Sequence, residues 1–89
     1  MITHNQLNSN VTKTALIYVN ADTNSESHAM YDVRIENNFV NGSIVARSSL
    51  KGSGNTVESN LGNDSGEIKT SCHVQVNNNE GFAQIPCEP

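Results

Sequence analysis

Three histidines are the first residues in this chain whose chemistry could form a site, because imidazole binds metal ions and transfers protons. They are His4, His28 and His73. No two of them are separated by the one or three residues that would place two imidazoles on the same metal ion. We therefore expect no metal site and no cofactor, and we interpret the three histidines as unconnected.

Cys72 precedes His73 directly, and a thiol beside an imidazole can act as a nucleophile. The alternation of apolar and polar residues around Cys72 predicts a strand, however, and neighbours on a strand point to opposite faces. The imidazole could not reach the adjacent sulfur in that geometry. The sequence therefore does not predict a Cys–His nucleophile.

The carboxylates are scattered, and no pair has a spacing that predicts general acid–base catalysis. Residues 63–67 include Asp64 and Glu67 and resemble the oxygen-rich turns that bind calcium. They lack the spacing of a twelve-residue calcium loop, so we interpret them as a structural turn. With no supported catalytic pair, we expect a protein that is not an enzyme.

Cys72 and Cys87 are the only cysteines. If they face each other in an antiparallel C-terminal hairpin, the residues between them also match, with Val74 opposite Ile85 and Val76 opposite Ala83. This register predicts a disulfide that closes a loop of roughly 15 residues and stabilises the fold by about 3 kcal/mol. The alternative is two free thiols in a cytosolic protein. The spacing matches no CxxC redox or zinc pattern.

Length and composition predict one small folded domain. The chain has 89 residues, of which 35% are hydrophobic, 16% are charged and fourteen are Asn. So small a domain has a thin core that a disulfide would help to stabilise. A neutral polar surface together with a disulfide is typical of proteins outside the cytoplasm. We expect a secreted, periplasmic or cell-surface protein.

Charge and hydropathy exclude two classes of partner. The net charge is −4, and the five Lys and Arg residues are too dispersed to neutralise a run of phosphates. No apolar run approaches the roughly 20 residues of a membrane span. We therefore expect no nucleic-acid partner and no membrane span.

The segment from His28 to Leu50 contains the strongest local signal. Asn41-Gly42 lies between two runs of strand-forming residues, and this dipeptide favours the two-residue turn of a hairpin. The alternation of the two arms predicts that one face is buried. That face consists of Tyr31, Val33, Ile35, Phe39, Ile44 and Leu50.

The rest of the chain shows alternation without any helical period. We expect a flexible lead-in at residues 1–10 and a single domain at residues 11–89, with further strands near 11–20, 57–61, 68–76 and 82–87. Turn residues recur about every ten positions, which favours a small antiparallel β-sandwich of about six strands, immunoglobulin-like, with the disulfide in its C-terminal hairpin. A small barrel is an alternative. A β-solenoid is less favoured, because Asn and Gly recur at no fixed repeat length.

These features favour a non-catalytic module that binds another protein through a sheet edge or an exposed strand face. The final strand ends at Pro86, which predicts an edge strand. The neutral surface that we expect to contact a protein partner includes His73 and Gln75 beside the final strand, together with Leu16 and Tyr18 on outer faces elsewhere. Partner identity and oligomeric state stay open.

Two other functions fit the same features. One is a structural subunit of a surface assembly such as a pilus, a fimbria or a phage surface. For the other, the strand layout, ending in a Cys after a short last strand, resembles small periplasmic sandwiches that keep amyloid subunits such as curli soluble. That resemblance implies a small inhibitor or chaperone for a secreted, amyloid-type partner.

Overall fold

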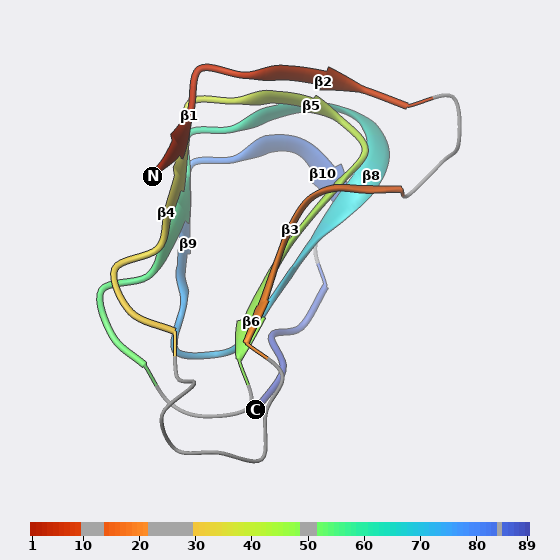
Figure 1. The fold of residues 1–89 in the computed structure, drawn as a ribbon. Coiled ribbons are helices and arrows are strands. Elements are labelled where there is room, and N and C mark those ends of the chain that lie inside the picture. The colour runs from red at the N-terminus through yellow and green to blue at the C-terminus, as the bar shows by residue number, and fades with distance from the viewer. Residues whose placement is uncertain (10–13, 22–29, 49–51, 84) are drawn as a thin grey trace.

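The computed structural model describes residues 1–9, 14–21, 30–48, 52–83 and 85–89, and within them every strand pairing is parallel. The chain winds as a three-sided β-solenoid of four coils (Figure 1). We number them coil 1 (residues 1–21), coil 2 (30–48), coil 3 (52–71) and coil 4 (72–88). Viewed from the N-terminal end, the chain turns clockwise as it recedes, so the solenoid is right-handed. The predicted antiparallel, immunoglobulin-like sandwich is therefore wrong.

Each coil adds one strand to the first sheet, whereas coils 1 and 2 add two strands each to the second sheet and coils 3 and 4 add one each. One sheet has four strands in the order β1-β4-β7-β9, and the other has six in the order β2-β5-β8-β6-β3 with β10 also paired to β8. The long strand β8 runs along two sides of the solenoid. Its first part pairs with β5 and β10, and its last part pairs with β6. The strands are β1 (Ile2–Thr3), β2 (Gln6–Asn8), β3 (Ala15–Ala21), β4 (Arg34–Glu36), β5 (Phe39–Asn41), β6 (Ser43–Ser48), β7 (Thr56–Glu58), β8 (Leu61–Thr70), β9 (Gln75–Asn77) and β10 (Glu80–Ala83).

One corner has the same local structure in all four coils. A residue with φ of 56–57° turns the chain out of the first sheet, and an asparagine follows it. Asn, His and Ser hold these left-handed positions, which are costly for β-branched residues. The left-handed residues are His4, Asn37, Ser59 and Asn78, and the asparagines that follow them are Asn5, Asn38, Asn60 and Asn79.

The four asparagines form a hydrogen-bonded ladder along the solenoid. The backbone N–H and the Nδ2 amide of Asn38 both donate to Oδ1 of Asn60, each at 3.0 Å. Nδ2 of Asn38 also donates to the carbonyl of Ile2 in the preceding coil, at 3.1 Å. Asn5 donates in the same way to Asn38, and Asn60 to Asn79. Asn38 and Asn60 are each only 2% exposed, so the ladder satisfies amides that would otherwise be costly to bury.

The ladder holds like residues above one another in the core. Ile2, Ile35, Val57 and Val76 occupy one position in successive coils, and Ile17, Ile44 and Ile68 occupy another. The inner members of these stacks, such as Ile35 and Val57, have no exposed surface. Burial of branched apolar side chains against one another is the main favourable contribution of each coil.

The predicted hairpin at Asn41-Gly42 is not formed. Asn41 ends β5 and Ser43 begins β6, and the two strands lie on successive sides of the solenoid. Gly42 does not have a positive φ. Glycine is needed there because neighbouring coils approach closely: a Cβ on Gly42 would lie 2.7 Å from the carbonyl oxygen of Thr14.

The buried face predicted for this segment is partly correct. Ile35 and Ile44 are fully buried, whereas Tyr31 is 60% exposed and Val40 is buried in addition. The alternation changes phase between Ile35 and Val40 because the left-handed residue and the ladder asparagine lie between them. Val33 and Phe39 are half-buried. Leu50 and His28 lie outside the described residues.

The other predicted strand boundaries also differ from the observed ones, because each corner of the solenoid interrupts a strand. Residues of the expected lead-in form β1 and β2, and the strand expected at 11–20 corresponds to β3, with residues 11–13 outside the described part. The turn expected at residues 63–67 lies within β8, where Asp64 has φ of 67° and bends the strand between two sides of the solenoid.

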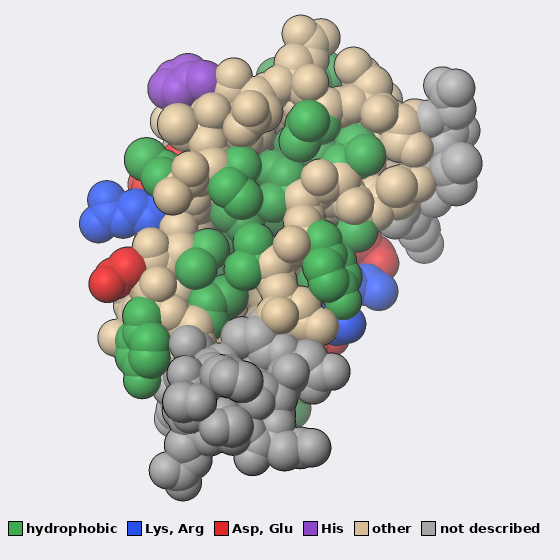
Figure 2. Space-filling model, viewed as in Figure 1, with side chains coloured by type: hydrophobic (Ala, Val, Ile, Leu, Met, Phe, Trp, Pro, Cys, Tyr) green, Lys and Arg blue, Asp and Glu red, His purple; other side chains and the backbone are tan. Residues whose placement is uncertain are grey.

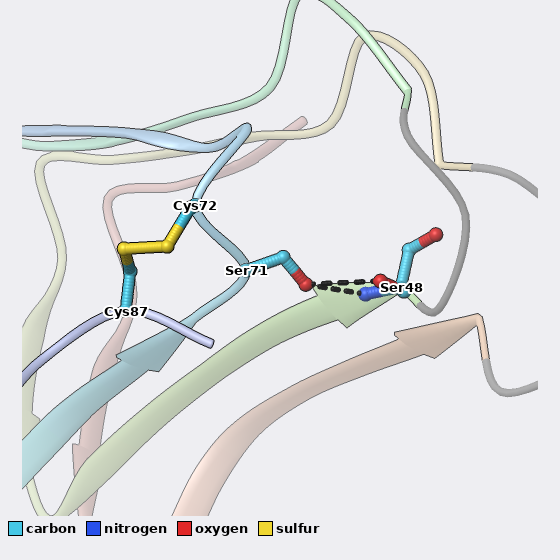
Figure 3. The surroundings of a disulfide bond; sticks show 4 residues. All are labelled: Ser48, Ser71, Cys72 and Cys87. Carbon is cyan, nitrogen blue, oxygen red and sulfur yellow. Dashed lines mark hydrogen bonds between the residues drawn. A yellow bond between two sulfur atoms is a disulfide. The ribbon is translucent and has the colours of Figure 1, made fainter. Parts of the chain in front are cut away.

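The predicted disulfide between Cys72 and Cys87 is present, with a Cα–Cα distance of 4.9 Å. The hairpin predicted around it is wrong, because Ser71 pairs with Glu88 in parallel. Beside the bridge, the Ser71 hydroxyl accepts a hydrogen bond from the Ser48 N–H at 2.8 Å and donates one to the Ser48 carbonyl at 3.1 Å (Figure 3). The bridge thus joins the beginning of coil 4 to its end, 15 residues later.

Reduction of this bridge should destabilise coil 4. We expect the intact mass to rise by about 2 Da on reduction and the unfolding midpoint to fall by about 10 °C, because the loop-closure contribution of about 3 kcal/mol is lost. Mass spectrometry and thermal unfolding with and without reductant measure both changes. A Cys72→Ser, Cys87→Ser double variant is the control and should not respond to reductant.

The ladder should contribute more to stability than any exposed asparagine does. Asn60→Ala would remove the acceptor of the Asn38 backbone N–H and Nδ2, and the Nδ2 donor to the carbonyl of Ile35. Oδ1 of Asn79 would keep only the hydrogen bond from the backbone N–H of residue 60. We expect a loss of at least about 3 kcal/mol in the free energy of unfolding. Asn77→Ala, at an exposed position of β9, should change it by less than about 0.5 kcal/mol. Equal effects in urea denaturation would contradict a stabilising ladder.

Candidate protein-interaction edge

The four residues predicted to contact a partner do not form one surface. Tyr18 lies on β3 and is 55% exposed, while Gln75 is exposed on β9, in the other sheet. Leu16 is half-buried and packs against the core. His73 is also half-buried, at the corner before β9.

Tyr18 takes part in a small polar cluster on the outer face of the solenoid. The Arg47 guanidinium lies 5.9 Å from the centre of its ring and donates to the Tyr18 hydroxyl at 3.4 Å. This hydrogen bond, with a smaller contribution from Glu88 at 3.3 Å from Arg47, raises the pKa of Arg47. Val45 and Lys69 border the same shallow hollow of about 170 Å³.

His73 of coil 4 contacts a buried asparagine of coil 3. Its Nδ1 lies 3.4 Å from Nδ2 of Asn55, which is 1% exposed. Asn55 in turn donates to the carbonyl of Met30 at 2.8 Å and accepts from the backbone of Val33 at 3.0 Å. His73 therefore extends a second buried polar stack that links coils 2, 3 and 4.

The C-terminal end of the solenoid exposes the interior of the fold. A hollow of about 470 Å³ lies there and is lined mainly by coil 4. Val76 is 43% exposed, although Ile35 and Val57 in the same stack are fully buried. The difference arises because no coil covers Val76 among the described residues. The residues around the hollow include Ile68, Val74, Val76, Phe82 and Ile85.

The backbone at this end is also open. Within the described residues, β9 pairs only with β7 and β10 pairs only with β8, so each strand has one free edge. The last strand is thus an edge strand, as predicted. Its bounds differ from the predicted 82–87, because the strand is Glu80–Ala83 and Pro86 lies beyond it. Natural proteins protect such edges with Lys, Pro or a covering element. Neither β9 nor β10 contains Lys or Pro.

The described residues supply no metal-binding cluster. No group of three or more His, Cys, Asp and Glu side chains lies close enough to hold an ion in this part of the chain. Nor does any helix in the same residues have the length and apolar character needed to cross a membrane.

The ladder is the feature that sequence reasoning missed. A four-residue pattern of Ile or Val, any residue, a left-handed residue and Asn begins at Ile2, Ile35, Val57 and Val76. Successive asparagines of the ladder are 33, 22 and 19 residues apart. A search for a short pattern at variable spacing would have found it, whereas a search for a fixed period does not.

No protein-family model, curated protein or solved structure matches this chain.

The open edge should be visible in amide hydrogen exchange. In dilute protein we expect peptides covering β9 to exchange about tenfold faster than peptides covering β7, because β7 is paired on both sides. Mass spectrometry of the exchanged protein measures this difference. Equal protection of the two strands would mean that another part of the chain covers the edge of β9.

Proposed function

We propose that this protein is a non-catalytic protein-binding module that takes up its partner at the open C-terminal end of the solenoid. The observation that carries the proposal is the exposure of Val76, 43%, in a stack whose inner members are fully buried. A partner that adds a β-coil at this position would bury the apolar hollow and pair the free edges of β9 and β10. This is recognition by β-augmentation.

The chemistry of coil 4 suits a protein better than a polyanion. Residues 72–89 contain no Lys or Arg, so this end has no group to neutralise a phosphate. Its side chains are mostly apolar or neutral, with Glu80 the single charged residue of β9 and β10. A neutral apolar surface costs little to desolvate when another polypeptide covers it.

The compartment proposed is secreted, periplasmic or cell-surface. The disulfide supports an oxidising environment, in which such bonds form and persist.

A structural subunit of a surface assembly is the second candidate. It is favoured by the regular stacking of the coils, which extends along one axis and can continue beyond a single chain. The chaperone hypothesis depended on the strand layout of an antiparallel sandwich. Because the fold is a parallel solenoid, that resemblance no longer supports it.

Capture of a partner by the immobilised protein tests the proposal. The bait is incubated with an extracellular fraction of the source organism, and retained proteins are identified by mass spectrometry. Val76→Lys places a charge in the hollow and should abolish retention. Gln75→Lys, one residue away on the exposed outer side of β9, carries the same charge and should retain the partner.

Tyr18→Glu extends the comparison to the outer face. If Tyr18→Glu abolishes retention while Val76→Lys does not, the binding surface is the outer face that includes Tyr18. If Gln75→Lys alone abolishes it, the binding surface is the outer face of the sheet that contains β9. Retention that is the same for all three variants and the wild type would overturn the proposal.

A further inference from the structure

We infer that the partner at the C-terminal end is the first coil of a second copy of this chain, stacked head to tail. The inference rests on the proposed function and names its partner. It draws on three properties of the two ends of the solenoid: the direction of the asparagine ladder, the apolar side chains and the distribution of charge.

The ladder has a direction, and its two ends are complementary. In every internal step, the backbone N–H and one Nδ2 hydrogen of an asparagine donate to Oδ1 of the asparagine in the next coil. Among the described residues, the N–H of Asn79 has no acceptor, and its Nδ2 donates only to the carbonyl of Val57 at 2.9 Å. Likewise, Oδ1 of Asn5 accepts no hydrogen bond from any described residue. Asn79 therefore offers donors where the ladder would continue, and Asn5 offers the matching acceptor.

The apolar surfaces of the two ends also match. Figure 2 shows hydrophobic side chains gathered in the middle of the N-terminal end, between the three sides of the solenoid. The partly buried apolar residues of coil 1 are Ile2, Leu7, Leu16 and Val19. In the register of the internal coils, Asn5 of the second copy would lie over Asn79, and Ile2 would lie over Val76. The stack of Ile2, Ile35, Val57 and Val76 would then continue with another branched side chain.

The charges permit this contact. The described residues of coil 1 include no Asp or Glu, and Gln6 would lie over Glu80 in the same register. No carboxylate of coil 1 therefore opposes Glu80 in this register. In a contact between two copies of the C-terminal end, both surfaces would instead carry Glu80, and both would offer the Asn79 donors without the acceptor that Asn5 provides.

Coils stacked head to tail along one axis do not form a closed ring, because every assembly keeps one free N-terminal end and one free C-terminal end. Analytical ultracentrifugation of the purified chain, with its disulfide intact, should show a weight-average mass that rises at least about twofold with concentration and passes beyond the dimer. Val76→Lys should abolish the rise, and the matched variant Gln75→Lys should leave it unchanged. A monomer at all concentrations, or association that stops at a dimer, would overturn the inference.

Cysteine trapping tests the orientation. Chains carrying Ile2→Cys and chains carrying Val76→Cys are mixed under mild oxidation, and a disulfide-linked dimer should form that reductant cleaves. Chains with Val76→Cys alone should stay unlinked, and so should a mixture in which Gln75→Cys replaces Val76→Cys. Peptide mapping confirms in each case that Cys72 and Cys87 stay bonded to each other. Linkage of Val76→Cys chains to one another would show that identical ends meet and would overturn the inference.

The two proposals can fail separately. If the purified chain stays monomeric while capture from the extracellular fraction returns a different protein that depends on Val76, the head-to-tail inference is wrong and the proposed binding end stands. If neither association nor capture depends on Val76, both are wrong.

Discussion

The hydrogen bonds between stacked asparagine amides are the constraint on which the rest of this structure depends. The two inner amides, Asn38 and Asn60, use their donors on the coils before and after them, as Asn38 does with Ile2 and Asn60. Because the bonds are short and directional, they hold successive coils in one register, and that register places Ile or Val on Ile or Val in the core. Coils separated by 33, 22 and 19 residues can therefore stack, since the corner aligns them whatever the length of the rest.

The same regularity explains why we propose recognition at the ends of the solenoid. Among the described residues, coils 2 and 3 are covered on both sides, whereas coils 1 and 4 each have an unpaired backbone edge and apolar side chains that are covered on one side only. Closure of coil 4 by the Cys72–Cys87 bridge supports that end without covering it, because the bridge joins the beginning of the coil to its end. An end that a disulfide already constrains would lose less conformational entropy on binding a partner than an unconstrained segment, which would favour the proposed association.

Much of the local structure could be predicted from the sequence by itself. Alternating apolar residues determined that the chain forms strands, and they placed Ile35 and Ile44 in the core. The two cysteines in a small, core-poor chain determined the disulfide. These features depend on side-chain preferences within a few residues, or on the presence of a single possible pairing, and neither requires knowledge of which strands are neighbours.

The direction of pairing was decided only by the tertiary structure. Asn41-Gly42 satisfies the requirements of a hairpin turn, but it equally permits an extended passage in which Gly42 lets two coils approach, and the choice depends on Thr14 in another coil. The position of the C-terminal edge likewise depends on which strands stack above and below. The amide ladder joins Asn5, Asn38, Asn60 and Asn79 across distances in sequence that no local preference spans. The hydrogen bonds of the ladder form only when the coils are in register. The parallel solenoid therefore depends on the whole fold and not on any one segment.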